Sequence, residues 1–322
     1  MINVGIVGLG WWGKNLVDAV QGRSDRIRFV RGACRNHAPV AAFADRHGLP
    51  LAASLDALLA DDSVQAVVLA TPHSLHTEQI IAVAAAGKPV FCEKPLTLTR
   101  ADAARAIDAC QRAGVVLALG ENNRFFPNMQ ELHRIATAGE LGDPMHIEGH
   151  TSNENSGVHF GAWRHSAAES PGGGMTGAGI HVLDALIHLM GPATSVTAQL
   201  VTRKPSPDPT DMLSAMFRFA AGTTGLFATL RSTPAYRRVH LFGRTGSAEA
   251  LGDAELVIRR SGKPTQALQF PRVDSLRREL DAFADAIEGR AAYPITSAEM
   301  LDTIAAFEAL VTSADTGRPV SI

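Results

Sequence analysis

Residues 5–20 read GIVGLGWWGKNLVDAV, and this stretch decides how the first half of the chain folds. Gly8, Gly10 and Gly13 stand in the spacing GxGxxG, after an apolar run expected to be a strand and at the start of an expected helix. The first glycine of such a turn permits a tight bend, the second lets the backbone approach a pyrophosphate, and the third lets the helix pack on the strand. The N–H groups at a helix N-terminus attract phosphate. The stretch therefore predicts a βαβ unit that binds a dinucleotide.

The first 120 residues continue to alternate apolar runs with helical patterns. The expected strands are 2–7, 27–33, 65–70, 89–92 and 115–119. A helix is expected over 76–87, ended by Gly87, and another over 99–114, ended by Gly114. Strands that are apolar throughout are typical of a sheet covered on both faces, so a parallel, doubly wound sheet is expected.

After residue 140 the pattern changes to closely spaced, partly alternating strands. They are expected at 144–152, 195–203, 213–219, 224–232, 237–243 and 255–260, with glycine-containing turns at 220–225 and 243–248. This spacing is typical of an antiparallel sheet with one open face. Two helices are expected to close the chain, at 275–289 and 297–317. The predicted fold is α/β: a Rossmann domain at 1–122, then an α+β domain at 123–322 with a large, mostly antiparallel open sheet.

Composition limits the kinds of partner. The chain has 322 residues, enough for two domains, and its 30 basic and 32 acidic residues leave a formal charge of -2. No basic footprint for nucleic acid or an anionic membrane is present, so a small-molecule substrate is expected. Three cysteines without CxxC spacing, no long apolar run and no secretory signal pattern predict a cytoplasmic protein without disulfides. The open sheet makes a homo-dimer or homo-tetramer plausible.

The end of the second strand bears on which dinucleotide is bound. An acidic residue about 20 positions after the last glycine normally holds the ribose hydroxyls, but this chain has Cys34, Arg35, Asn36 and His37 there. A guanidinium at that place suits a 2′-phosphate, which favours NADP over NAD. The alternative is that Arg35 stacks on adenine in a protein that uses NAD or either cofactor.

Further cofactor contacts are expected outside the carboxyl ends of the strands, where ligands bind in open α/β sheets. ATPHSLHTE at 70–78 follows one strand, and CEKP at 92–95 follows the next. The pair of histidines in the first segment is not a metal site by itself, because catalytic zinc needs at least three protein ligands. No metal is expected. The expected cofactor contacts are Gly8, Gly10, Trp11, Trp12, Gly13, Arg35, Asn36, Thr71, Pro72, His73, His76, Glu93, Lys94, Glu121 and Arg124.

Lys94 is the leading catalytic candidate. An ammonium at the carboxyl end of a strand can hydrogen-bond a substrate hydroxyl, hold its oxygen as a carbonyl forms, and exchange its proton. Glu93 supplies a neighbouring opposite charge. The alternative is a surface lysine in a turn that Pro95 ends.

Five segments together carry a resemblance to a known family. They are GLGWWG, TPHSLHTE, CEKPLTLT, ENNRFFP and GGGMTGAGIHVLDAL, in that order. The chain resembles, over essentially its whole length, the glucose-fructose oxidoreductase, inositol dehydrogenase and rhizopine-catabolism family (Gfo/Idh/MocA) of NAD(P)-dependent oxidoreductases. The resemblance implies hydride transfer at a carbinol carbon of a sugar, cyclitol or related polyol. It also implies that Lys94 is the catalytic lysine, with a Lys94–Pro95 link that can be cis.

The resemblance assigns a second catalytic residue, His181. In many members an aspartate stands four residues before this histidine, but here the position is Gly177. Asp184 lies one helical turn after His181 and can orient it, or can be a structural partner of a basic group. The expected substrate contacts are Asn122, Arg124, Asn153, Trp163, Arg164, Thr176 and Asp184.

The sequence thus predicts an NAD(P)-dependent dehydrogenase or reductase that acts on CH–OH groups. Because Gly177 replaces the carboxylate, one alternative is a regulatory or sensor protein that binds NAD(P) without turnover. Another is a dehydrogenase of an aromatic cis-dihydrodiol.

Overall fold

The computed structural model describes residues 1–154, 162–203 and 211–322. The chain forms two compact units, Met1–Asn122 with Asp274–Met300 and Asn123–Val273 with Leu301–Ile322. The segment 274–300 belongs to the predicted second domain, 123–322, but it packs within the first unit. Its helix buries Leu280, Phe283 and Ala284 completely, and the Phe283 ring lies 5.8 Å from the Phe91 ring.

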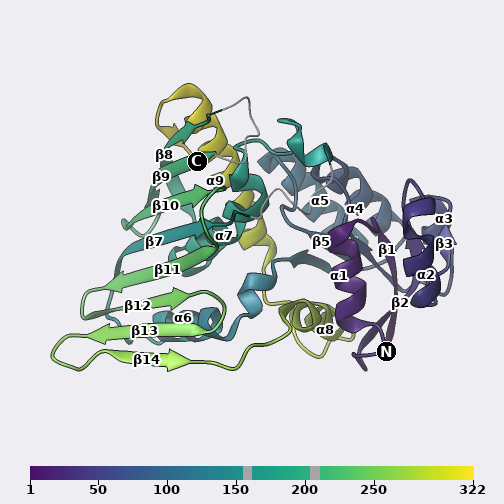
Figure 1. The fold of residues 1–322 in the computed structure, drawn as a ribbon, viewed down its shortest axis with the longest axis horizontal. Helices are drawn as coiled ribbons and strands as arrows, with labels where there is room; N and C mark the ends of the chain where they lie inside the picture. The colour runs from purple at the N-terminus through teal and green to yellow at the C-terminus, as the bar shows by residue number, and fades with distance from the viewer. Residues whose placement is uncertain (155–161, 204–210) are drawn as a thin grey trace. The chain divides into compact units, whose positions relative to one another are not determined.

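The first unit is built on a parallel sheet, as predicted (Figure 1). The sheet has six strands, one more than the five expected from the sequence. The strand order β3-β2-β1-β4-β5-β6 is that of the doubly wound dinucleotide-binding fold, with its reversal between β1 and β4. The strands are β1 (Ile2–Val7), β2 (Ile27–Ala33), β3 (Leu51–Ala52), β4 (Ala66–Leu69), β5 (Val90–Glu93) and β6 (Leu117–Gly120). The helices are α1 (Trp11–Val20), α2 (Ala41–Arg46), α3 (Leu55–Leu59), α4 (His76–Ala85), α5 (Arg100–Ala113) and α8 (Ser275–Ile287).

Local signals explain where the longer helices begin and end. The Thr99 hydroxyl accepts a hydrogen bond from the Asp102 backbone N–H at the start of α5. Gly114, at φ +65°, ends α5 in the left-handed conformation, and Gly87, at φ +68°, follows α4. These ends confirm the two predicted helices.

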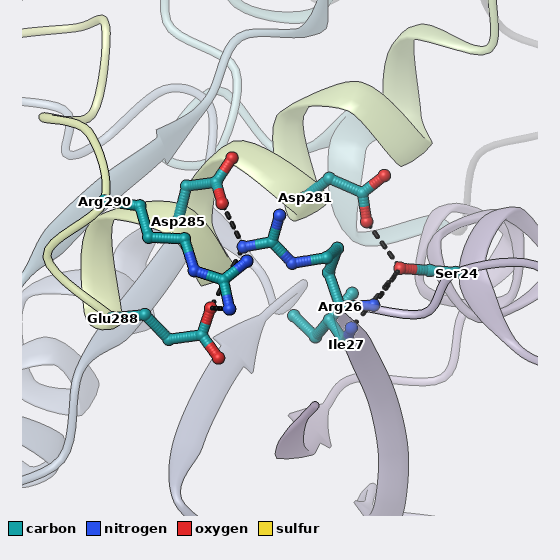
Figure 2. Close-up of polar contacts among 7 residues, drawn as sticks. All are labelled: Ser24, Arg26, Ile27, Asp281, Asp285, Glu288 and Arg290. Atoms are coloured by element: carbon teal, nitrogen blue, oxygen red, sulfur yellow. Dashed lines mark hydrogen bonds and ion pairs between the residues drawn. The ribbon is translucent and has the colours of Figure 1, made fainter.

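Polar contacts hold the outer side of α8 on the first unit, as Figure 2 shows. The Ser24 hydroxyl donates to Asp281 at 2.5 Å. The Arg26 guanidinium pairs with Asp285 and, at 3.0 Å, with Glu288, so the loop before β2 binds a helix from the far end of the chain.

The second unit is built on a nine-stranded sheet with the order β14-β13-β12-β11-β7-β10-β9-β8-β15. Only β7 and β10 pair in parallel within this described sheet, which confirms a large, mostly antiparallel sheet. Its strands are β7 (Pro144–Ser152), β8 (Ala193–Val201), β9 (Met212–Phe219), β10 (Thr224–Leu230), β11 (Tyr236–Gly243), β12 (Gly246–Leu251), β13 (Glu255–Arg260), β14 (Gln266–Gln269) and β15 (Val320–Ser321). The helices are α6 (Pro127–Thr137), α7 (Ile180–Met190) and most of α9 (Ser297–Thr316).

Helix α7 lies closely over one face of this sheet. A Cβ at Gly149 of β7 would lie 2.4 Å from Val182 and 2.6 Å from Leu186, so only glycine fits beneath the helix. The opposite face exposes large apolar side chains, including Met216 and Leu226, which pair across β9 and β10. The expected packed face and open face are both present.

Candidate functional site

The turn after β1 has the geometry that a dinucleotide requires. Gly8 has φ +97°, and a Cβ there would lie 2.3 Å from the Ala70 carbonyl oxygen. A Cβ at Gly13 would lie 1.9 Å from the Gly8 carbonyl oxygen, so this glycine allows α1 to pack against the turn. By contrast, a Cβ added at Gly10 would have no described atom within 4 Å other than those of its neighbours in the chain. Protein packing does not explain Gly10, whereas the close approach of a pyrophosphate does.

The N-terminus of α1 suits the same anion. Its first helical residue is Trp11, and no side chain of the described protein caps the helix there. No acidic residue lies in the first turn, so no side-chain charge there opposes the binding of a phosphate. Trp11 is 43% exposed, and its ring lies 5.4 Å from that of Trp12.

The two glycines give a paired prediction. Gly10→Ala is expected to leave thermal stability unchanged and to raise the Kd for NAD(P)H at least about tenfold, or ~1.4 kcal/mol. Gly13→Ala is expected to destabilise the protein by about 1–3 kcal/mol through overpacking. Thermal denaturation without cofactor and fluorescence titration with cofactor measure the two effects. Unchanged cofactor affinity in Gly10→Ala would contradict the phosphate assignment.

The residues after β2 lie at the surface. Arg35 and Asn36 are both exposed, and the Asn36 side-chain oxygen accepts a hydrogen bond from the Ala38 backbone N–H at 3.2 Å. Asn36 therefore shapes the turn, while the Arg35 guanidinium is accessible to a ligand. The structure places no acidic residue directly after this strand, as the sequence indicated.

Thr71, Pro72 and His73 lie in the loop after β4, and His76 is the first residue of α4. The Thr71 hydroxyl donates to Gln79 Oε1 at 2.6 Å, and His73 is buried. His76 is fully buried, with Nδ1 2.9 Å from the Pro95 carbonyl oxygen and Nε2 3.1 Å from the Thr71 carbonyl oxygen. The His76 ring thus links the loop after β4 to the loop after β5, a structural role that the sequence did not indicate.

Lys94 stands at the end of β5, at the carboxyl edge of the sheet. It is only 8% exposed, and its peptide bond to Pro95 is cis. Its backbone N–H donates to Glu93 Oε2 at 3.3 Å. A surface lysine in an open turn would be far more exposed, so the structure does not support that alternative.

Glu93 lies in a tightly packed, buried position. A Cβ at Gly120 of β6 would lie 2.8 Å from Glu93 Oε1, so glycine at that position makes room for the carboxyl group. Burial raises the pKa of Glu93 to about 7, against the opposing effects of Lys94 and Trp12. Glu121, directly after β6, is 1% exposed. The predicted residues Glu93, Lys94 and Glu121 therefore belong to one buried group in the first unit.

Sequence reasoning missed one member of this group, Glu279 of α8. Its side chain is fully buried, and its carboxyl group interacts electrostatically with Glu93, Glu121 and Lys94. Nothing in the residues around position 279 shows that its helix returns to the first unit. An acidic residue on the apolar side of an amphipathic helix was the available signal.

In the second unit, two predicted site residues pair with each other. Arg124 Nε donates to Asp184 Oδ2 at 2.5 Å and Nη2 donates to Oδ1 at 3.0 Å, and the side chains are 5% and 3% exposed. The geometry therefore favours the second alternative for Asp184, that it is a structural partner of a basic group. This bidentate pair connects helix α7 with the segment that precedes helix α6. His181 is the second residue of α7, and it is partly exposed.

Gly177 lies in a π-helical turn, Met175–Gly179, that leads into α7. A Cβ there would have the Arg164 Nη1 at 3.7 Å as its nearest described neighbour, so a side chain would fit. The Arg164 guanidinium also lies 4.9 Å from the centre of the Trp163 ring.

Three other predicted substrate contacts have structural partners. The Asn122 amide donates to the Ser275 hydroxyl at 2.9 Å, joining the end of β6 to the start of α8. Thr176 is fully buried, and its hydroxyl donates to the Pro171 carbonyl oxygen. Asn153 follows β7, where its backbone N–H donates to the Leu230 carbonyl oxygen at 3.2 Å. In the described parts of the chain, no three His, Cys, Asp or Glu side chains are placed to hold a metal ion.

Comparison with known proteins identifies the family. Residues 2–121 match the profile of the oxidoreductase family with an NAD-binding Rossmann fold, and residues 129–249 match the GFO/IDH/MocA C-terminal domain. The chain belongs to the Gfo/Idh/MocA family of oxidoreductases. Membership confirms the resemblance seen in the sequence, and the chain is an NAD(P)-dependent enzyme of this family.

Relatives match this Gfo/Idh/MocA chain over its full length. D-xylose 1-dehydrogenase (NADP(+)) 2 of Haloferax volcanii is 30% identical, over 99% of this chain and 98% of the relative. Inositol 2-dehydrogenase 2 of Saccharopolyspora erythraea is 28% identical, over 100% and 96%. The structure of levoglucosan dehydrogenase with NADH and levoglucosan is similar in fold, with a TM-score of 0.89 at 23% identity, over 100% of this chain and 99% of that one.

Proposed function

We propose that this enzyme oxidises a hydroxyl group, or reduces the matching ketone, of a sugar, cyclitol or related polyol. The observation that carries the proposal is Lys94, a buried lysine at the carboxyl edge of a dinucleotide-binding sheet. The relatives named for xylose and inositol dehydrogenation support the substrate class. Asn153, Trp163 and Arg164 remain candidates for positioning the polyol.

The proposed roles of the residues follow from their chemistry. A bound NAD(P) would accept or supply the hydride at its nicotinamide ring. The turn at Gly8, Gly10 and Gly13 and the N-terminus of α1 would hold the pyrophosphate of this dinucleotide. Lys94 takes the proton of the substrate hydroxyl during oxidation and returns it during reduction. His181 is proposed as a second group on the substrate, without the carboxylate that many family members carry at the position of Gly177.

A substrate panel tests the proposal. Purified enzyme is incubated with pentoses, hexoses, inositols, amino sugars and an aromatic cis-dihydrodiol, with NAD and NADP separately, and reduced nicotinamide is followed by its absorbance. Turnover with one or more polyols is expected. Cofactor binding without turnover on the whole panel would favour the sensor alternative that Gly177 raises, and turnover with the cis-dihydrodiol alone would overturn the substrate class.

NADP is proposed as the preferred cofactor because Arg35 is exposed where the adenine ribose is expected. Charge-assisted hydrogen bonds are worth about 1.5–3 kcal/mol each, so Arg35→Ala is expected to weaken NADP binding at least about tenfold. NAD binding is expected to change little. Arg35→Lys, which keeps the charge but not the fork geometry, is the control and should fall between the two. Equal losses for both cofactors would reject the phosphate role.

A homo-dimer or homo-tetramer through the open face of the nine-stranded sheet is also proposed. Met216 and Leu226 lie opposite each other on that face and are 59% and 43% exposed. Both residues line a cavity of about 450 Å³ on the surface of these strands. The double variant Met216→Glu/Leu226→Glu is expected to lower the mass measured by light scattering to that of a monomer. A wild-type monomer would contradict the proposal.

A cytoplasmic location is proposed from the cysteines. Cys34, Cys92 and Cys110 are free thiols, and burial raises the pKa of Cys110 to about 11. Such thiols suit a reducing compartment. Separately, no helix among the described residues is long and apolar enough to cross a membrane.

A further inference from the structure

Glu279 is a buried acid without a local reason to be charged. Neither of its carboxyl oxygens has a hydrogen-bond partner within the described structure, and the side chain is fully buried. It lies on the inner side of α8, opposite the acidic residues that pair with Ser24 and Arg26 in Figure 2. The outer contacts fix the helix, and the helix therefore holds Glu279 in place.

The charges that face Glu279 come from three elements. Glu93 and Lys94 stand at the end of β5, Glu121 follows β6, and Asp274 precedes α8 itself. We call Glu93, Glu121 and Glu279 the buried carboxyl cluster. Among the described residues that act on Glu279, the Lys94 ammonium is the group of opposite charge.

The cluster cannot be fully ionised without a large cost, because buried charges need a partner. Glu279 has the least compensation, since it accepts no hydrogen bond within the described structure. Burial, reinforced by Glu93 and Glu121, raises the pKa of Glu279 well above its usual range. Glu279 is therefore the member that keeps its proton, while Glu93 titrates near pH 7.

We propose that Glu279 is a positioning residue, held as a neutral carboxylic acid behind Lys94, and that its neutrality lets Lys94 alternate between ammonium and amine. This inference rests on the proposed function. During oxidation the hydride of the C–H bond would pass to a bound nicotinamide, and the Lys94 amine would take the proton of the O–H bond as the carbonyl forms. A second anion beside Lys94 would stabilise the ammonium, so less of Lys94 would be in the amine form that can accept the proton. Ionisation of Glu279 therefore sets the alkaline limit of the reaction.

Three variants test the proposal. Glu279→Gln imitates the protonated acid, Glu279→Asp keeps a buried carboxyl group, and Asp281→Asn is the matched control, an acid-to-amide change on the outer side of the same helix. The profile of kcat against pH is measured from pH 5 to 9. The denaturation midpoint without substrate is measured over the same range.

The stability measurement has a definite sign. The folded state binds the Glu279 proton more tightly than the unfolded state, so wild-type stability falls as pH rises from the unfolded pKa through the raised folded pKa. One such proton changes the unfolding equilibrium constant by up to about tenfold per pH unit. Glu279→Gln is expected to lose this part of the decrease in stability with rising pH, and to become more stable than wild type at pH 9. Asp281→Asn should keep the same decrease in stability.

The activity measurement is expected to show that Glu279→Gln keeps kcat within about threefold at pH 7 and retains activity to higher pH. Glu279→Asp should keep an alkaline decline. A more than tenfold loss of kcat in Glu279→Gln at pH 7 would overturn the proposal, because an ionised carboxylate would then be required. Equal pH dependence of stability in wild type and Glu279→Gln would also overturn it. If wild type turned over no substrate, the proposed function would fail while the stability measurement still decided whether Glu279 holds a proton.

Discussion

Lys94→Ala is expected to lower kcat by about 10²–10⁴-fold, the usual contribution of a positioned acid–base group. The Kd for NAD(P)H should stay within a few-fold, because the proposed phosphate site is formed by the glycine turn and α1 and does not include Lys94. Stopped-flow or steady-state assays with the best substrate of the panel measure the first effect, and fluorescence titration measures the second. Since Lys94 is buried beside carboxyl groups, Lys94→Met, which keeps more of the side-chain volume, is made in parallel.

Folding of both Lys94 variants is checked by circular dichroism before kinetics are compared. Lys263→Ala, at an exposed position in the second unit, is the control for loss of a lysine and should leave kcat unchanged. Normal turnover in folded Lys94→Ala would remove the catalytic assignment.

Arg124→Ala is expected to destabilise the second unit by about 3–5 kcal/mol, because it leaves the buried Asp184 carboxylate without its partner. The free energy of unfolding is measured by urea denaturation. The chain has three tryptophans, and replacing Trp11 and Trp12 by phenylalanine leaves Trp163 to report on the second unit. The fluorescence of Trp163 then follows the unfolding of the second unit separately from that of the first unit.

Two controls make this prediction specific. Arg134→Ala removes an exposed ion pair with Glu131 and should have a much smaller effect. The double variant Arg124→Met/Asp184→Leu removes both charges and should recover most of the lost stability, because an apolar pair of similar volume avoids the desolvation cost. If Arg124→Ala unfolds at the wild-type urea concentration, the pair is not a structural element.

Most of the fold was predictable because its signals are local. The apolar runs located eleven of the strands, and β1, β2, β7 and β13 have the predicted bounds. The prediction missed β3, β12, β14 and β15. The turn predicted at 243–248 is confined to Arg244 and Thr245, because β11 extends to Gly243 and β12 begins at Gly246. Pairing with β11 and β13, rather than its own composition, holds β12.

The candidate site was predictable where a motif fixes the backbone and much less so where partners are distant in sequence. The roles of Gly8 and Gly13 follow from spacing, and the structure gives each the predicted close contact. That Arg124 pairs with Asp184, or that Asn122 binds Ser275, depends on contacts between residues 60 and 153 positions apart. Sequence periodicity carries no information about such pairs, and for the same reason it did not reveal Glu279.

The return of α8 to the first unit has a consequence for biosynthesis. A ribosome must translate the segment Asn123–Val273 of the second unit before the helix that completes the nucleotide-binding unit emerges. Until then Phe91 lacks the Phe283 ring, and the end of β6 lacks its bond to Ser275. An N-terminal fragment ending at residue 122 would therefore be an incomplete folding unit, and the nascent chain acquires the complete first unit only near the end of its synthesis.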